Sequence, residues 1–285
     1  MKMNKIITSI IKWLTVPALL ALVVLTQLNF DRVRASQWRK STVTYNQIIE
    51  PIVPNKDMLK ISALGNNNFM ADLLWLNTIQ YYGGGDPYGK YQALPKLMSS
   101  ILSLDNKFSY PYQFSGIVLS GEGFSDQALQ ILKDGEVALP NNWEIPYYEG
   151  TIYYINKKDY AQSAAAYKRA SEKPGAPSKT KFLSAVEFDR SNDYQTALAI
   201  FEGLAESSDT QYFKDRAKLF VDHYTILQGL TNMIKDYKNK FGHYPKDLNE
   251  LVQKHYLTEI PKDPLNRDIL YDSNTGAVTS PVGKN

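Results

Sequence analysis

The chain has no cysteine and only three histidines among its 285 residues. The absence of cysteine excludes disulfide bonds, thiolate metal ligands and thiol catalysis. His223, His243 and His255 do not stand in the H-x-x-x-H or H-E-x-x-H spacing that places two imidazoles on one metal ion. We therefore expect the histidines to be surface or hydrogen-bonded core residues, and we expect no metal ion.

Motifs of enzyme chemistry are also missing. The stretch GGGDPYGK (residues 83–90) resembles a phosphate loop only superficially, because Lys90 is followed by Tyr91 instead of serine or threonine and no buried strand precedes it. No G-x-S-x-G nucleophile motif occurs. The sequence favours a protein that is not an enzyme and carries no cofactor.

Positive charge is concentrated in a single part of the chain. Residues 1–60 hold nine lysines and arginines against three acidic residues, although the whole chain has a net charge of only +3. A nucleic-acid-binding body needs clustered cations on its folded surface, whereas these cations flank an apolar run. The distribution predicts membrane proximity and no nucleic-acid partner.

The apolar run extends from Ile6 to Phe30 and is interrupted only by Lys12. It is long enough to cross a bilayer, which needs about 20 residues in a helix. We expect the lipid bilayer to be a partner through residues 6–30. A cleavable signal is the alternative, because Val33 and Ala35 are spaced like a cleavage site. Basic residues on both sides leave the positive-inside comparison nearly tied.

A linker and two amphipathic helices are expected next. Residues 36–60 contain two prolines and no sustained helical period, which indicates a juxtamembrane linker. Within residues 66–82, Phe69, Leu73, Leu76 and Ile79 recur at helical spacing, as do Leu94, Leu97, Met98, Ile101 and Leu104 within residues 91–104. We expect both sets to face the core.

From Tyr110 onward the sequence repeats itself every 34 residues. The pairs at this spacing are Gly116 and Gly150, Asp159 and Asp193, Tyr160 and Tyr194, and Tyr167 and Phe201. A helix pair with this period cannot bury its apolar face alone, so successive pairs must stack. Small residues such as Gly150 and Ala185 are expected where the two helices of a pair cross closely.

These positions resemble the tetratricopeptide repeat family. The matching residues are Tyr112, Gly116, Leu119, Ala128, Leu132 and Pro140 in a first unit; Gly150, Tyr153, Asp159, Tyr160, Tyr167 and Ala170 in a second, with one residue inserted before Asp159; and Ala185, Phe188, Asp193, Tyr194, Ala197 and Phe201 in a third. The resemblance implies an all-α helical solenoid whose first helices line a concave groove that binds a protein or peptide.

The resemblance also implies which residues line this partner-binding groove. They are Gln113 and Ile117 in the first unit, Tyr147, Thr151 and Tyr154 in the second, and Phe182, Val186 and Asp189 in the third. The set is mixed and aromatic, and it lacks the run of lysine or arginine that would hold an acidic peptide terminus. An apolar or extended segment is the expected partner, although each residue could instead be solvated or covered by a neighbour.

The C-terminal residues predict a different structure. After residues 213–242, which should form one or two capping helices, residues 241–280 predict a short helix with Leu248, Leu251 and Val252 and then a hairpin turning at DSNTG. This order is similar to the C-terminal part of type II secretion major pseudopilins, a family that binds calcium near this loop. Asp263, Asp268, Asp272 and Asn274 offer oxygen donors, but a turn explains DSNTG better.

The sequence thus predicts an all-α, tetratricopeptide-like solenoid with an N-terminal transmembrane helix and a small C-terminal α+β appendage. The expected parts are a membrane anchor (1–35), a linker (36–60), a repeat domain (61–240) and a helix-and-hairpin segment (241–285). We expect a single-pass inner-membrane scaffold in a bacterial cell-envelope assembly, of the type IV pilus or type II secretion kind, with its bulk extracytoplasmic. A periplasmic or cytoplasm-facing chaperone or structural protein unrelated to pili is the alternative.

Overall fold

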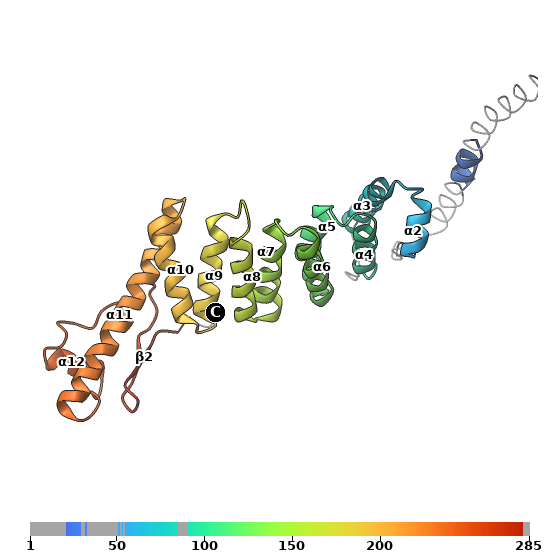
Figure 1. Ribbon diagram of the computed structural model, residues 1–285. Helices are drawn as coiled ribbons and strands as arrows, with labels where there is room; N and C mark the ends of the chain where they lie inside the picture. The colour runs from blue at the N-terminus through green and yellow to red at the C-terminus, as the bar shows by residue number, and fades with distance from the viewer. Residues whose placement is uncertain are drawn as a thin grey trace, which may run out of the picture. The chain divides into compact units, whose positions relative to one another are not determined.

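The computed structural model describes residues 21–29, 32, 51, 53, 55–84 and 91–281. These residues are mostly helical, with one small antiparallel sheet near the C-terminus (Figure 1). The elements in chain order are α2 (Lys56–Ser62), α3 (Asn67–Gly83), α4 (Leu94–Leu104), α5 (Ser109–Phe114) continuing as the π-helical turn η1 (Ser115–Leu119), α6 (Ser125–Ala138), α7 (Glu144–Ile152) continuing as η2 (Tyr153–Lys157), α8 (Tyr160–Ser171), α9 (Ser178–Arg190), α10 (Tyr194–Ser207), α11 (Gln211–Phe241), α12 (Leu248–Gln253), β1 (Leu270–Asp272) and β2 (Ala277–Thr279).

Aspartates set the starts of three of these helices. The side chains of Asp159, Asp193 and Asp247 each accept a hydrogen bond from the backbone N–H three residues further on, at the start of α8, α10 and α12. This contact satisfies one of the N–H groups that a helix leaves unpaired at its first turn. Gly242 ends α11 in the left-handed conformation, with φ of 81°, which glycine adopts without a steric penalty.

Each helix from α6 to α11 packs against the next one along the chain. We call the pairs α5/η1 with α6, α7/η2 with α8, and α9 with α10 the first, second and third units. The long helix α11 packs on α10 and also contacts α9, so it covers the apolar side of the third unit. The expected capping helices are therefore a single helix.

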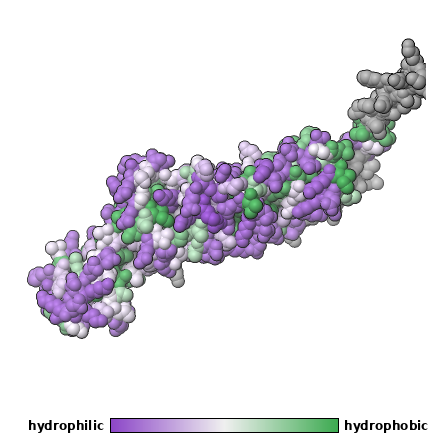
Figure 2. Space-filling model, in the orientation of Figure 1, coloured by the Kyte–Doolittle hydropathy of each residue, from purple (hydrophilic) through white to green (hydrophobic). Residues whose placement is uncertain are grey.

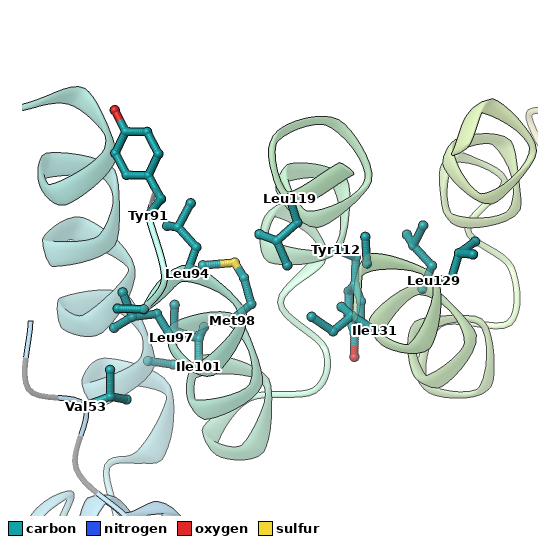
Figure 3. Packing of buried hydrophobic residues seen from close by; sticks show 14 of the residues in the cluster. Val53, Tyr91, Leu94, Leu97, Met98, Ile101, Tyr112, Leu119, Leu129 and Ile131 are labelled. Atoms are coloured by element: carbon teal, nitrogen blue, oxygen red, sulfur yellow. The ribbon is translucent and has the colours of Figure 1, made fainter. Parts of the chain in front are cut away.

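The core contains the side chains that the repeat pattern singled out. One cluster of buried residues runs from Val53 through α4 and the first unit to Ile152 (Figure 3). Leu94, Leu97, Met98, Ile101 and Leu104 of α4 all belong to it, as predicted. A second cluster joins α9, α10 and α11, where the rings of Phe201 and Phe220 stack with centroids 4.0 Å apart. A third joins the end of α11 to α12 and the hairpin.

Small residues let neighbouring helices approach closely. A Cβ atom on Gly150 would lie 2.9 Å from Cδ1 of Tyr167, on the second helix of the same unit. The two helices therefore lie too close together for a larger residue at position 150. At this close approach the Ser163 hydroxyl on α8 donates a hydrogen bond to the Gly150 carbonyl at 2.9 Å. Ala185 is fully buried, and Ser184 beside it donates to the Ala164 carbonyl at 3.0 Å. The predicted close crossing is confirmed at Gly150, whereas Ala185 is a buried member of the cluster that joins α9, α10 and α11.

The inserted residue of the second unit lies in a stretch that contains a π-helical turn. Gly150 is followed by Tyr160, the first residue of α8, after ten residues, whereas Ala185 is followed by Tyr194, the first residue of α10, after nine. The π-helical turn η2 lies within this longer stretch. The first unit also contains a π-helical turn, η1, although Gly116 is followed by Ser125, the first residue of α6, after only nine residues, so a π turn alone does not mark an insertion.

One predicted apolar stripe faces outward. Phe69, Leu73, Leu76 and Ile79 of α3 are all exposed, so the expectation that they face the core was wrong. The opposite side of α3, with Ala71, Leu74, Trp75 and Thr78, is the one that packs inward. The error has a physical origin, because α3 carries large apolar side chains on both faces and periodicity alone cannot choose between them.

The N-terminal expectations lie largely outside the described residues. Of the predicted span, residues 21–29 are described, and they are helical. Within the part of the chain that the structure describes, no helix combines the length and apolar character needed to cross a bilayer. The predicted linker was wrong for residues 56–60, because these residues begin α2 and bury Leu59.

The C-terminal segment has the predicted elements. Leu248 and Leu251 of α12 are buried, and β1 pairs with β2 in antiparallel register, Tyr271 opposite Val278. The DSNTG stretch is a turn, in which Asp272 accepts hydrogen bonds from the Asn274 N–H and the Thr275 hydroxyl. The described residues from Pro51 to Pro281 belong to one compact unit, so this segment is part of the same unit as the helices.

Candidate protein-binding face

The eight predicted groove residues all lie on the first helices of the three units. Gln113 and Ile117 are on α5/η1, and Tyr147, Thr151 and Tyr154 are on α7/η2. Phe182, Val186 and Asp189 are on α9. The three groups differ in their surroundings, because α10, α11 and the C-terminal segment contact the residues of the third unit.

Two of these residues join each first helix to the next. The Gln113 side-chain amide donates to the carboxylate of Glu144, which opens α7. The Lys179 ammonium on α9 donates to the Tyr147 hydroxyl at 2.8 Å and lies 5.0 Å from the centre of its ring. These contacts place the first helices of consecutive units side by side along one face.

Tyr147 and Thr151 belong to an aromatic group on α7. The ring of Tyr147 packs against those of Trp143, Tyr148 and Tyr167. The Thr151 hydroxyl lies 3.0 Å from the Tyr167 hydroxyl. Burial raises the pKa of Tyr167 to about 12, although the contact with Thr151 lowers it. Tyr167 therefore stays a neutral phenol that supports the half-buried Tyr147 from beneath.

Tyr154 lies at the junction of the second and third units. The guanidinium of Arg190 sits 5.0 Å from the centre of the Tyr154 ring and 5.8 Å from that of Tyr160. The Arg190 Nε atom is 3.7 Å from a carboxylate oxygen of Glu187, which is buried. Burial raises the pKa of Glu187 to about 7, with Arg190 opposing the rise and Asp189 adding to it. The junction thus contains a carboxyl group that titrates near neutrality.

Phe182 and Val186 serve the core of the third unit. The Phe182 ring packs against those of Phe201, Phe213 and Phe220, and Val186 packs against the same cluster. Leu265 of the C-terminal segment also packs on this cluster. Both side chains are nevertheless only half-buried, as Tyr147 and Thr151 are, so their role in binding a partner stays a prediction.

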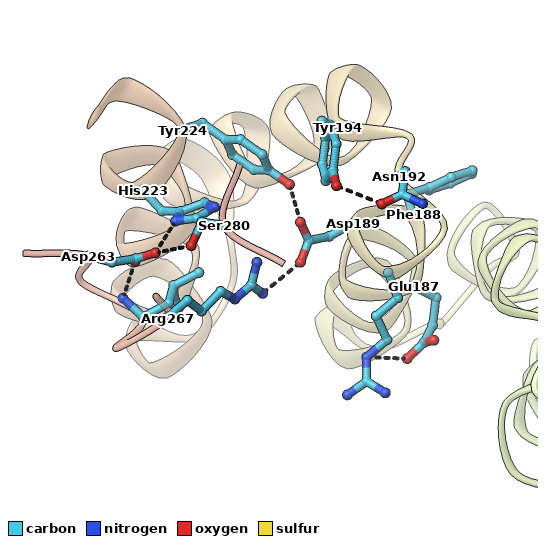
Figure 4. A network of polar contacts seen from close by, with 12 residues as sticks. Glu187, Phe188, Asp189, Asn192, Tyr194, His223, Tyr224, Asp263, Arg267 and Ser280 are labelled. Atoms are coloured by element: carbon cyan, nitrogen blue, oxygen red, sulfur yellow. Dashed lines mark hydrogen bonds and ion pairs between the residues drawn. The ribbon is translucent and has the colours of Figure 1, made fainter. Parts of the chain in front are cut away.

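Asp189 is held by the same segment (Figure 4). Its side chain is fully buried, and it accepts hydrogen bonds from the Tyr224 hydroxyl on α11 and from Nη2 of Arg267, each at 2.6 Å. Burial is the main reason that the pKa of Tyr224 is raised, and the Asp189 carboxylate raises it further. The prediction of Asp189 as a partner-binding residue is corrected. It anchors the C-terminal segment instead.

A second buried contact fastens that segment to α11. The Asp263 carboxylate lies 2.8 Å from Nδ1 of His223 and accepts a hydrogen bond from the Ser280 hydroxyl at 2.8 Å (Figure 4). Burial lowers the pKa of His223, and the neighbouring Asp263 opposes this shift. His223 is thus a hydrogen-bonded core histidine, as expected. The described residues contain no group of three or more histidine or acidic side chains placed to hold a metal ion.

The five predicted groove residues of the first two units all keep exposed surface. Ile117 is 57% exposed, and Gln113, Tyr147, Thr151 and Tyr154 are half-buried. We call these five residues the open face. Lys179 and Arg190 contact Tyr147 and Tyr154 of the open face. The sequence did not predict these two residues, because each contacts a residue of the neighbouring unit and the spacing within one unit does not reveal such contacts.

Comparison with known proteins gave no match. The chain matches no model of a protein family, and neither curated protein sequences nor solved structures contain a significant relative.

Proposed function

We propose that this protein is a membrane-anchored scaffold of the tetratricopeptide type, which binds a protein partner on its open face. The observation that carries the proposal is the alignment of the first helices, which are joined residue to residue by Gln113 with Glu144 and by Lys179 with Tyr147. Stacked helix pairs of this kind present a continuous surface whose shape recognises a protein segment. The role is binding, not catalysis.

The chemistry of the open face suggests the kind of segment that fits it. Ile117 offers an exposed aliphatic contact, and Tyr147 and Tyr154 offer broad rings with polar tips. Tyrosine gives large contact area at low entropic cost, which makes it common in binding surfaces. The partner on this proposal is an apolar, extended segment whose backbone can bond to the hydroxyl and amide groups.

The location proposed for the protein rests on sequence. The apolar run with basic flanks would anchor it in the inner membrane with a single span. The C-terminal order of helix, proline-rich turn and hairpin is similar to that of pseudopilins, which supports an extracytoplasmic body. We assign the protein to a cell-envelope assembly of the type IV pilus or type II secretion kind.

A photo-crosslinking experiment tests the binding role. A benzoyl-phenylalanine placed at Ile117 in the full-length chain, expressed in its native membrane, should crosslink to one discrete protein. The matched control is Val137 on α6, which is apolar and 84% exposed but lies outside the open face. Equal crosslinking from both positions, or none from Ile117, would refute the assignment of the open face.

The absence of cysteine allows a direct test of orientation. A single Ser207→Cys variant places one thiol at an exposed position of α10, in a chain that otherwise has no cysteine. A membrane-impermeant maleimide should label it when the outer membrane is opened and the inner membrane is intact. Labelling that requires lysis of the inner membrane would place the body in the cytoplasm.

A further inference from the structure

Helix α3 is apolar on both of its faces. Its inward face carries Leu74, Trp75, Tyr81 and Tyr82, which pack against the cluster that includes α4. Its outward face carries Phe69, Leu73, Leu76 and Ile79, with exposed fractions of 63%, 40%, 55% and 43%. An apolar stripe on a helix normally packs against another part of its environment. We therefore expect another molecule or a membrane to cover the outward face of α3.

The preceding helix adds to this surface. Met58, Ile61 and Leu64, in α2 and directly after it, are also exposed. We call these three residues, together with Phe69, Leu73, Leu76 and Ile79, the outer apolar face. Figure 2 shows hydrophobic surface at the end of the described body where α2 and α3 lie. Exposed apolar surface of this kind marks a site that contacts a protein or a membrane.

The side chains of the outer apolar face suit a bilayer better than a protein. They are aliphatic residues and one phenylalanine, whereas tyrosine, tryptophan and arginine dominate the energetic centres of protein interfaces. The tyrosines and the tryptophan of α3 pack on its inward side. The polar residues around the face include the neutral Asn68, Asn77 and Gln80 and two carboxylates, Asp57 and Asp72. Neutral side chains lose little solvation free energy when they enter the headgroup region.

The position of α2 in the chain supports the same occupant. Between the end of the predicted span at Phe30 and the start of α2 at Lys56 there are 25 residues. Fully extended, they reach about 85 Å at most, so a chain anchored through residues 6–30 allows α2 and α3 to reach the membrane surface. Lys56 and Lys60 of α2 are exposed, and their ammonium groups can reach anionic headgroups beside the apolar side chains.

We propose that the outer apolar face lies on the surface of the lipid bilayer, with its apolar side chains in the headgroup and acyl boundary. Such contact is the usual arrangement of an interfacial helix. It would hold the first helices of the body against the membrane and so fix how far the open face stands from the bilayer. This inference rests on the proposed membrane anchor, and its test separates the two.

The test uses single-cysteine variants of the full-length chain in vesicles of phosphatidylcholine and phosphatidylglycerol. Leu76→Cys and Phe69→Cys report on the outer apolar face, and Val137→Cys on α6 is the matched exposed control. Each thiol carries an environment-sensitive nitrobenzoxadiazole label. We expect the labels at Leu76 and Phe69 to shift to the blue and to lose fluorescence to nitroxide-labelled lipids, while the label at Val137 does neither.

Each other outcome overturns a defined part of the proposal. If the protein floats with the vesicles but the labels at Leu76 and Phe69 behave like that at Val137, the anchor stands and the bilayer contact is refuted. If these labels shift to the blue without lipid quenching and transfer energy between copies, a second copy covers the face instead. If the protein does not float, the proposed anchor fails and the inference fails with it.

Discussion

Arg267 in the C-terminal segment binds Asp189 on α9, 78 residues earlier in the chain, through a hydrogen bond of 2.6 Å from Nη2 to Oδ2. The Asp189 side chain is fully buried, and the Arg267 guanidinium also lies 5.5 Å from the centre of the Phe220 ring. This contact, with Leu265 packed on the same cluster, closes the third unit with the chain's own C-terminal segment. The open face of the first two units lies outside these contacts.

Replacing Arg267 with methionine should lower the free energy of unfolding by about 3 kcal/mol. The change keeps an apolar stem but leaves the Asp189 carboxylate buried without its cation, a situation that costs roughly 3 to 5 kcal/mol. Urea unfolding of the full-length chain in detergent measures the loss.

The matched control for Arg267 is Arg216→Met, at an exposed position on α11, which should change stability little. Adding Asp189→Asn to Arg267→Met should recover part of the loss, because the uncompensated charge is then removed. Equal losses from Arg267→Met and Arg216→Met would contradict the account of the third unit.

Two glycine substitutions should have opposite effects. In Gly116→Ala the new Cβ would lie 2.5 Å from Cβ of Tyr148 on α7, an atom close to the backbone that cannot swing away. We expect a loss of about 1 to 3 kcal/mol from this overpacking. In Gly229→Ala, in the middle of α11, nothing lies within 4 Å of the new Cβ, so the better helix former should add about 0.5 to 1 kcal/mol. Thermal unfolding of both variants measures these two effects. If both variants shifted the melting midpoint in the same direction, the prediction would be contradicted.

Glu187 should make stability fall as the pH rises toward neutrality. Its pKa is raised from 4.5 to about 7 by burial, so between these values the folded chain keeps a proton that the unfolded chain releases. The stabilisation is fully present below pH 4.5 and is lost as the pH rises through 7. Glu187→Gln removes the titrating group and should therefore stabilise the protein at pH 8 by about 2 kcal/mol, allowing for solvent screening, with little effect at pH 4.

Melting curves at the two pH values measure this difference. Glu202→Gln, at an exposed position on α10, is the control and should shift the midpoint little at either pH. A Glu187→Gln variant that is less stable than the parent at pH 8 would show that the Arg190 contact outweighs the cost of burial.

Deleting Ile155 should preserve the fold of the second unit. Ile155 is 53% exposed and lies within η2, where the extra residue relative to the third unit is accommodated. Its removal should convert the π-helical turn to an α-helical one and leave α8 in place. Circular dichroism and thermal unfolding should show a smaller loss than deletion of Val186 from α9, where no extra residue is present. A larger loss of stability from the Ile155 deletion than from the Val186 deletion would show that the π-helical turn does not accommodate the inserted residue.

The helices and much of the core could be predicted from sequence because they depend on local spacing. The 34-residue step located the units, and the periodicity of Leu94 to Leu104 identified a face that is buried. Long-range contacts could not be predicted in this way. Asp189 was assigned to the groove because nothing near it in the sequence reveals Arg267, and the exposed stripe of α3 was assigned to the core because both faces of that helix are apolar.

The most direct test of the open face is its affinity for the partner crosslinked at Ile117. Isothermal titration of the full-length chain in detergent should show that Ile117→Lys, which puts a charge at the centre of the contact, weakens binding at least about tenfold, a loss typical of a central interface residue. Val137→Lys, at the more exposed control position, should bind like the parent. Equal affinities for the parent and both variants would contradict the claim that the first helices form the binding surface.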